Sequence, residues 1–587
     1  MPIMKKITHL ADSFKQVLTI LFAHGQIKDN NSQTQATMPA QPVLGNNIKD
    51  LWSVGSSPIN IKKVSHYLNN YTNRDEANFL LHGLTLGFKL QYSGPRRPLF
   101  SKNLLSASEN WEALQEKLDK EVQEGRMVGP FKDPPLRNLH VSPIGVIPKA
   151  DGGWRMITHL SYPPSNSINS HIDPVHTTVK YTSFDTVIHT ISDLGKGSKL
   201  AKVDIKNAFR LLRVYPGDFE LLGMFFRGGF YIDKCLPFGC SISCKIFETF
   251  AVFLEWAIKE RTGLDTVHHY LDDFIFIGSE NTDHCSQLMT SFEIMCSEFG
   301  IPLNKDKTLG PTTSLIFLGL EIDTISMQIR IPAHKVIELS QLLNYWVNKE
   351  KIIFKELESL VGKLNFFGKA IPGSRAFIRR FYNAMLGPLM PYHHIRITKS
   401  LREDMKIWLQ FLEHFNGIVI FPDTEWSTPE TLQLFTDSTG SENLGCGCYF
   451  QGQWTYFQWP AEWQNSQILK DITFLELIPI VLAFMIWGVS LSSKMLILHI
   501  DNISLVHILN KQSSKSDRVM SLLRPLMLMS LKNNIQFKAQ HIPGKSNIIA
   551  DAISRKQWEV FRKEAPSADL NPQLIPAQFQ RVISMVK

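Results

Sequence analysis

Cysteine is scarce in this chain, and the few cysteines present are not arranged to hold zinc. There are seven in 587 residues, and none of them forms a CxxC pair. This number is too small for a disulfide scaffold, so free thiols in a reducing compartment are expected. The composition therefore favours an intracellular protein, in the cytoplasm, the nucleus or both.

Long hydrophobic runs are also missing. The N-terminal apolar stretch VLTILFA (17–23) has seven residues and no obvious cleavage site, whereas a membrane-spanning helix needs roughly 18 or more apolar residues. We therefore expect no membrane partner. With 44% hydrophobic and 20% charged residues, the chain can instead bury the cores of several domains.

The chain also has no excess of acidic residues. Lys and Arg outnumber Asp and Glu by 62 to 54, which gives a net charge of +8. Such a balance suits a polyanionic partner but does not identify one.

The order of sequence patterns predicts several regions. Residues 25–47 are polar and predict a disordered linker, and residues 110–126 have helical spacing. The middle of the chain alternates short β-rich runs with helical patterns, which indicates an α+β region. After Asp323 the pattern is mainly helical up to about residue 415, and a second alternation of strands and helices covers 433–555.

The segment HHYLDDFIFIG (268–278) places two adjacent carboxylates in an apolar run. The runs 267–270 and 274–277 predict two strands, with Leu271 to Asp273 at the tip of a tight hairpin. A third carboxylate, Asp204, ends the predicted strand KLAKVD. Three converging acids could hold two Mg²⁺ ions for nucleotidyl transfer, although YLDD taken alone fits a solvated turn equally well.

The order of the motifs around these acids resembles that of reverse transcriptases. The series is WRMITHLSYPPSNSIN (154–169), KVDIKNAF (202–209), CLPFGCSIS (235–243), YLDD (270–273), LNKDK (303–307) and FLGLEI (317–322). Within it, THLSYPPSNSIN and LPFG, together with residues 57–88, are most similar to DIRS-type retrotransposons. Gypsy-like elements and retroviruses are more distant relatives.

The resemblance implies a metal-binding role for the palm acids. Asp204 and Asp272 match the two metal-binding carboxylates of the family, and Asp273 matches the supporting third. The backbone carbonyl of Ile205 matches one that also contacts a metal. The implied cofactor is Mg²⁺, two ions per active site, with Mn²⁺ as an alternative.

The resemblance also implies a set of nucleotide-binding residues. Lys149 and Arg155 match basic residues that hold the incoming triphosphate, although exposed cations are more often simply solvated. Phe209 matches the aromatic residue beneath the sugar, and Lys307 matches a lysine that can protonate the leaving pyrophosphate. Phe238 stands where retroviruses have Gln, so that side-chain hydrogen bond is absent. HLSYP likewise replaces a more acidic fingers segment.

A second acidic constellation lies near the C-terminus. Asp437 ends a β-like run, Glu476 lies in a helical pattern, Asp501 ends another strand, and His541 and Asp551 follow. Four carboxylates of this kind can hold two divalent ions around a scissile phosphate, and a mobile histidine can act as a general acid. The order Asp, Glu, Asp, His, Asp resembles ribonuclease H.

The fold class implied is an α+β right-hand polymerase with fingers, palm and thumb, followed by an α/β ribonuclease H-like domain. Residues 357–385 combine five basic side chains with aromatic ones, which suits contact with an RNA–DNA duplex and equally suits a solvated helix face. The predicted parts are a largely disordered segment (1–50), an N-terminal extension (51–135), fingers and palm (136–325), thumb (326–395), connector (396–430), ribonuclease H domain (431–556) and tail (557–587).

The predicted function is RNA-directed DNA synthesis combined with degradation of the RNA strand of the hybrid. The predicted partners are an RNA template, a DNA primer, the RNA–DNA hybrid and dNTPs, while the oligomeric state is not predicted. One alternative is a domesticated, non-catalytic nucleic-acid-binding protein with the same fold, and intact acids at both sites count against it. A templated polymerase of another purpose is the other alternative.

Overall fold

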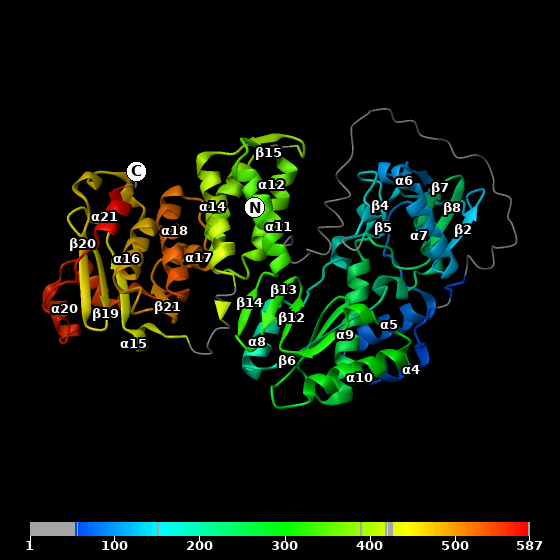
Figure 1. The fold of residues 1–587 in the computed structure, drawn as a ribbon, viewed down its shortest axis with the longest axis horizontal. Helices are drawn as coiled ribbons and strands as arrows, with labels where there is room; N and C mark the ends of the chain where they lie inside the picture. The colour runs from blue at the N-terminus through cyan, green and yellow to red at the C-terminus, as the bar shows by residue number, and fades with distance from the viewer. Residues whose placement is uncertain are drawn as a thin grey trace. The chain divides into compact units, whose positions relative to one another are not determined.

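The computed structural model describes residues 53–584 apart from residues 56, 150–151, 372, 388–389, 417–418 and 421–425, and it leaves undescribed the side chains of 419–420, 429–430 and 545. The segment predicted to be disordered (1–50) lies outside the described residues. The chain divides into two units, Met1–Leu315 and Ile316–Lys587, and the division falls within β12 (Ser314–Phe317) (Figure 1).

A five-stranded sheet forms one part of the first unit. Its order is β1 (Leu99–Phe100), β3 (His140–Val141), β7 (Gly223–Phe226), β8 (Gly229–Asp233) and β2 (Met127–Phe131). The hairpin of β4 (Ile144–Pro148) and β5 (Trp154–Thr158) lies nearby, with α6 (Leu105–Glu109) and α7 (Trp111–Gln123) packed against it.

The helix α7 shows why this region holds together. Leu114 and Leu118 are four residues apart, so they lie on one face of the helix and both are fully buried. They share a hydrophobic core with Met127, Ile144 and Met224. Residues of the predicted N-terminal extension and of the predicted fingers are therefore packed into the same core.

The second part of the first unit is built on a four-stranded sheet. Its order is β11 (Leu309–Thr312), β6 (Lys199–Asp204), β10 (Asp273–Gly278) and β9 (Val267–Tyr270). The helices α8 (Phe184–Leu194), α9 (Ser243–Thr262) and α10 (His284–Phe299) pack against these strands. The run Phe274–Ile277 is buried throughout, which explains why it is apolar without alternation.

Two N-terminal helices complete the first unit. They are α4 (Ile61–Leu68) and α5 (Arg74–Leu86), and each begins at an asparagine whose side chain accepts a backbone N–H of the first turn. The rings of Tyr67 and Phe299 lie 5.2 Å apart, and those of Tyr71 and Phe253 lie 5.6 Å apart. The helical pair therefore packs on α9 and α10.

The second unit begins with a mainly helical region, as the sequence predicts. After β13 (Leu320–Asp323) and β14 (Gln328–Arg330) come four helices and a short strand pair. These elements are α11 (Ala333–Val347), β15 (Lys351–Ile353), α12 (Phe354–Phe367), α13 (Arg379–Ala384), β16 (His394–Arg396) and α14 (Lys399–His414). The strand β17 (Val419–Ile420) pairs with β14.

The predicted second alternation of strands and helices is confirmed in the rest of this unit. The strands β18 (Leu434–Ser438), β19 (Gly445–Phe450) and β20 (Gln453–Gln458) are antiparallel, and β21 (Met495–Ile500) runs parallel to β22 (Gln536–His541). The helices are α16 (Ile472–Trp487), α17 (Ile503–Lys511), α18 (Asp517–Lys532) and α19 (Ile548–Ser554). Nearly all of α16 is buried, and it packs against β18, β19 and α18.

The segment predicted as a tail is folded where it is described. It forms α20 (Trp558–Glu564) and α21 (Ala577–Ser584). The ring of Phe561 lies 5.2 Å from that of Trp454, and Phe579 lies 5.1 Å from Phe457. Both helices therefore pack on β20.

A buried carboxylate joins the helical region of the second unit to α18. Asp404 of α14 is completely buried and accepts hydrogen bonds from Arg380 and from Arg524 of α18. Removing one partner from a buried ion pair typically costs about 3–5 kcal/mol, so this contact ties the two regions firmly together.

All seven cysteines lie in the described ranges, and each is buried and forms no disulfide there. None of the helices in those ranges has the length and apolarity that a membrane crossing requires.

Candidate active sites

The acidic hairpin predicted from YLDD is present. The strands β9 and β10 are antiparallel, and the turn between them contains Leu271, whose φ of 53° is unusual for a residue with a branched side chain. The predicted tip included Asp273, but this residue is already paired in β10, opposite Tyr270 on one side and Asp204 on the other. The ladder thus brings Asp204 and Asp273 side by side.

Asp272 is held next to Asp204 by the backbone. Its carbonyl oxygen accepts the N–H of Ile205 at 3.0 Å. The three acids and the Ile205 peptide, which lie in two segments far apart in the sequence, therefore meet at one end of β6 and β10.

The carboxylate of Asp204 is buried and partly compensated by its neighbours. Lys307 Nζ lies 3.1 Å from Oδ2, and Asn304 Nδ2 donates to Oδ1 at 3.3 Å. Burial raises the pKa of Asp204, Lys307 lowers it, and the charges of Asp272 and Asp273 raise it further, so that the net shift is upward. A cation bound among these acids would relieve the repulsion between them.

The donor chemistry of this cluster fits a hard divalent ion. Carboxylate and carbonyl oxygens are the ligands that Mg²⁺ prefers. Across the described residues, however, no three His, Cys, Asp or Glu side chains already have the spacing of a formed metal site.

The predicted nucleotide-binding aromatics lie together. Phe209 is in the 3-10 turn η3 (Ala208–Leu211) and is half-buried. Its ring centroid is 5.3 Å from that of Phe238 and 5.4 Å from that of Phe247. Gly239, with φ of +94°, approaches the carbonyl of Thr158 so closely that a Cβ would lie 2.8 Å from it, which seats the LPFG loop against the end of β5.

The two predicted phosphate-binding cations lie on the β4–β5 hairpin. Arg155 pairs with Ile147 in the ladder, and the N–H of Lys149 donates to the carbonyl of Gly153 at 2.8 Å. Both side chains are exposed, so each is free to reach a phosphate in solution, and their role stays a prediction.

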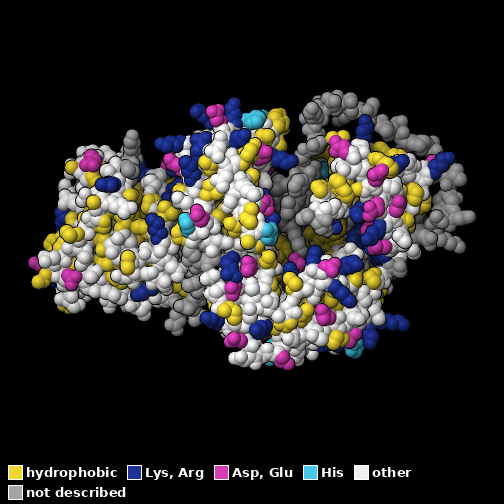
Figure 2. Space-filling model, viewed as in Figure 1, with side chains coloured by type: hydrophobic (Ala, Val, Ile, Leu, Met, Phe, Trp, Pro, Cys, Tyr) yellow, Lys and Arg dark blue, Asp and Glu magenta, His cyan; other side chains and the backbone are white. Residues whose placement is uncertain are grey.

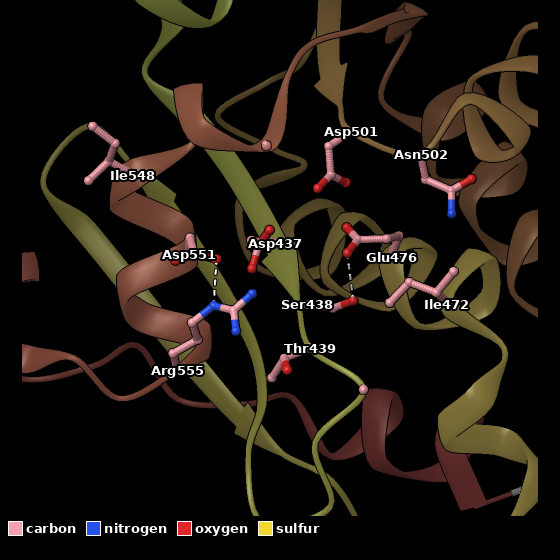
Figure 3. A pocket seen from close by; sticks show the side chains of 12 residues that line it. Asp437, Ser438, Thr439, Ile472, Glu476, Asp501, Asn502, Ile548, Asp551 and Arg555 are labelled. Atoms are coloured by element: carbon pink, nitrogen blue, oxygen red, sulfur yellow. Dashed lines mark hydrogen bonds and ion pairs between the residues drawn. The ribbon is translucent and has the colours of Figure 1, made fainter.

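The C-terminal acids meet in one pocket of about 610 Å³. Figure 3 shows the carboxylates of Asp437, Glu476, Asp501 and Asp551 turned toward a common space, although they come from β18, α16, the end of β21 and α19. The side chains of Ser438, Thr439, Ile472, Asn502, Ile548 and Arg555 also line the pocket.

Hydroxyl donors hold the two most buried acids. Ser554 Oγ donates to Asp437 Oδ2 at 2.6 Å, and Ser438 Oγ donates to Glu476 Oε1 at 2.9 Å. The pKa of Asp437 is raised to about 7, mainly by burial. The hydrogen bond from Ser554 lowers this pKa, and the nearby charges of Asp551 and Asp501 raise it.

Glu476 behaves in the same way as Asp437. Burial raises its pKa well above the usual range, and the charges of Asp437 and Asp501 raise it further. Four oxygen-donor acids that repel one another fit divalent cations.

His541 is near this pocket but does not line it. It is exposed, and its Nε2 lies 3.2 Å from the carbonyl oxygen of Asp501. Its predicted role as a general acid stays a prediction.

Sequence reasoning missed several contacts at both sites. Arg555 Nε lies 2.6 Å from Asp551 Oδ1 (Figure 3), and the spacing of four residues in DAISR was a signal for this pair. Nothing local in the sequence pointed to Asn304 or Ser554, because their partners are 100 and 117 residues away.

Two of the basic side chains in the predicted duplex-binding segment (357–385) are paired with acidic residues. Lys363 Nζ lies 2.6 Å from Glu338 Oε1, and Arg380 is paired with Asp404. On the face drawn in Figure 2, Lys and Arg side chains lie among acidic and apolar ones. The predicted role of this face is not tested by these contacts.

The segment that contains the first site is similar to a known protein family. Residues 147–322 match the family described as reverse transcriptase (RNA-dependent DNA polymerase). This segment includes Lys149, Arg155, Asp204, Asp272 and Lys307. The similarity confirms the predicted right-hand polymerase fold for this part of the chain.

Similar curated proteins are transposon polyproteins. The chain is 20% identical over 462 residues to the Transposon Tf2-7 and Tf2-8 polyproteins of Schizosaccharomyces pombe, covering 77% of this chain and 32% of each polyprotein. It thus spans about a third of the length of these relatives.

Similar solved structures are of the foamy viral protease-reverse transcriptase. One is in complex with dsDNA (16% identity, 86% of this chain and 99% of that chain covered, TM-score 0.46), and another is in complex with an RNA/DNA hybrid (16% identity, 91% and 67% covered, TM-score 0.45).

Proposed function

We propose that the chain is an RNA-directed DNA polymerase that also degrades the RNA strand of the hybrid it makes. The observation that carries this proposal is the presence of two separate sets of converging carboxylates. One set lies within the reverse transcriptase domain, and the other lines a pocket in the second unit.

In the proposed polymerase site, Asp204, Asp272, Asp273 and the Ile205 carbonyl would hold two Mg²⁺ ions. Bound there, the ions would activate the primer 3′-hydroxyl and stabilise the leaving pyrophosphate. Lys307, which lies next to Asp204, is close enough to donate a proton to that leaving group. Lys149 and Arg155 bind the triphosphate, and the apolar face of Phe209 excludes a ribose 2′-hydroxyl.

In the proposed hydrolytic site, the four pocket acids would hold divalent ions, which would activate a water molecule to attack a phosphate of the RNA strand as its 3′-oxygen departs. Ser554 and Ser438 orient the carboxylates of Asp437 and Glu476 through the hydrogen bonds described above. His541 lies at the rim and protonates the departing oxygen. The convergence of these acids in one pocket and the order of the residues in the sequence support a ribonuclease H site.

The proposed substrates are an RNA template, a DNA primer, dNTPs and the resulting hybrid. Similarity to transposon polyproteins supports an origin in a retrotransposon, and the motifs THLSYPPSNSIN and LPFG support the DIRS type. We propose the domain boundaries given by the sequence patterns: fingers and palm 136–325, thumb 326–395, connector 396–430 and ribonuclease H domain 431–556. An intracellular location, in the cytoplasm, the nucleus or both, accords with this function.

Primer extension tests the proposal directly. The purified chain should extend oligo(dT) on poly(rA) with dTTP and Mg²⁺, and the same preparation should cut the RNA of a preformed hybrid. Absence of extension in a folded preparation, with nucleic-acid binding retained, would favour a non-catalytic binding protein instead.

A further inference from the structure

A buried guanidinium, that of Arg210, belongs to the residue that follows Phe209 of the proposed nucleotide pocket. Arg210 Nη1 donates to Asp233 Oδ2 at 2.7 Å, while Nη2 and Nε donate to Glu121 Oε2 at 2.7 and 3.0 Å. A buried charge of this kind is stable only when its partners are in place, because leaving it unpaired costs several kcal/mol. The position of Arg210 is thus fixed by two carboxylates.

Arg210 touches both segments that carry the pocket aromatics. It follows Phe209 directly in η3, and its Nη1 also donates to the carbonyl of Leu236 at 3.4 Å. Leu236 opens the LPFG loop that contains Phe238, and its N–H donates to Leu212 at 2.9 Å. The Arg210 guanidinium therefore links η3, which carries Phe209, to the LPFG loop, which carries Phe238.

Asp233 shapes the same loop from the other side. Its Oδ1 accepts the N–H of Cys235 at 3.0 Å, while its Oδ2 accepts Arg210. The turn 233–236 and η3 consequently share a single buried ion-pair network.

The second carboxylate of this network comes from outside the reverse transcriptase match. Glu121 lies in the last turn of α7, whereas the match begins at residue 147. Arg126 holds it with two bonds, from Nε at 2.8 Å and from Nη2 at 2.5 Å. Burial raises the pKa of Glu121, but Arg126 and Arg210 outweigh burial and lower the pKa to about 2, so the group stays charged at working pH.

We propose that Glu121 is a positioning residue for the nucleotide pocket, acting through Arg210. Without its charge, Arg210 would be compensated by Asp233 alone and would shift toward it. This shift would loosen η3 and the LPFG loop together, and Phe209 and Phe238 would lose their fixed spacing of 5.3 Å. The inference rests on the proposed function, because it takes these rings to contact the incoming nucleotide.

The test compares Glu121→Gln with Glu124→Gln in the full chain. Glu124 is a matched control because it also pairs with Arg126 from the end of α7 but makes no hydrogen bond or ion pair with Arg210 among the described residues. We expect Glu121→Gln to raise the KM for dNTP by about fivefold or more, with kcat per active site within about twofold of wild type. Glu124→Gln should match wild type in both constants.

Hydrogen exchange supplies a readout that does not need activity. In Glu121→Gln, amides of residues 207–212 and 233–238 should exchange at least about tenfold faster, and those of β18 to β20 should be unchanged. If Glu121→Gln does not fold, Arg210→Lys, which keeps the charge but not the forked geometry, should show the same pattern more weakly.

The outcomes separate the inference from the function on which it rests. Unchanged exchange in 207–212 and 233–238, or a fall in the fraction of active enzyme at constant dNTP KM, would overturn the positioning role. Wild-type chain that shows no nucleotide incorporation at all would instead overturn the proposed function, and the exchange data would still decide whether Glu121 holds the two segments.

Discussion

The two acidic sites hold carboxylates together in different ways. In the palm, an amine of the same chain compensates the most buried acid, because Lys307 lies 3.1 Å from Asp204. In the C-terminal pocket, the two most buried acids, Asp437 and Glu476, are held by serine hydroxyls. Arg555, the one cation among the described side chains that line the pocket, pairs with Asp551.

Because the two sites stabilise their carboxylates differently, protons should compete with metal ions more strongly at one site than at the other. A lysine stabilises the charged form of Asp204 and limits the rise in its pKa, whereas burial with hydroxyl donors leaves Asp437 with a pKa of about 7. The C-terminal pocket should thus be the more sensitive to pH near neutrality, and the palm site the more tolerant.

The strongest test of this comparison is whether the two sites act independently. Asp272 lies in the first unit and Asp437 in the second. Asp272→Asn should lower DNA synthesis by about a thousandfold or more and leave RNA cleavage largely intact, while Asp437→Asn should do the reverse. Steady-state rates of both reactions on one preparation measure this. Loss of both activities in either folded variant would rule out two separate sites.

The raised pKa of Asp437 should also make the stability of the chain depend on pH. Without divalent ions, Asp437 keeps its proton up to about pH 7 in the folded chain, whereas in the unfolded chain it loses the proton near the ordinary pKa of 3.8. The folded state then binds more protons between these values, so the free energy of unfolding should fall as pH rises from about 4 to 7, by up to about 4 kcal/mol.

Urea unfolding in EDTA at several pH values measures this effect. The control is Asp437→Asn, which should make the dependence shallower, with Glu476 accounting for the part that remains, and Mg²⁺ should restore stability at pH 8 in the wild type. A wild-type dependence identical to that of the variant would show that Asp437 ionises normally.

Sugar selection should depend on the palm site alone. Phe209→Val removes the ring that lies against Phe238 and Phe247, so a ribose 2′-hydroxyl should then be accommodated. We expect the ratio of rNTP to dNTP efficiency to rise at least about tenfold, which corresponds to roughly 1.4 kcal/mol at the transition state. RNA cleavage serves as the internal control. Equal losses with both nucleotides would indicate that Phe209 only packs in the core.

The smallest effect is expected from the basic residues of the helical region. Lys363 is already paired with Glu338, so its neutralisation should have a small effect. Neutralising Lys363 and Arg379 together should reduce the slope of log binding constant against log salt concentration by about one to two for duplex binding. The change should be the same for every sequence tested. A loss that depends on sequence would point to base recognition.

Local patterns were sufficient for much of the palm. The run FIFI predicted a buried strand and KLAKVD predicted a strand that ends at Asp204, and both strands are present because strand positions follow from the apolar pattern. Asp273 was predicted in the turn but is the first residue of β10. The α16 helix with Glu476 was predictable for the same reason.

Long-range ion pairs were not predictable from local patterns. Glu121, which pairs with Arg210, is 89 residues away, and Glu338, which pairs with Lys363, is 25 residues away. No periodic pattern in the sequence predicts pairs at such separations. The pairing of Lys363 with Glu338 and the link from α7 to the palm were consequently missed. The helices within residues 558–584 were missed as well, because Phe561 and Phe579 pack on Trp454 and Phe457, which are more than 100 residues away in the sequence.

The central claim is that one chain copies RNA and then removes it. The most direct measurement follows both strands in one reaction, with a labelled DNA primer on a differently labelled RNA template, dNTPs and Mg²⁺. The account predicts that the primer lengthens and that RNA fragments appear only where hybrid exists, with the single-stranded RNA ahead of the primer left intact. Full extension with an intact RNA strand, using wild-type chain at pH 8, would contradict it.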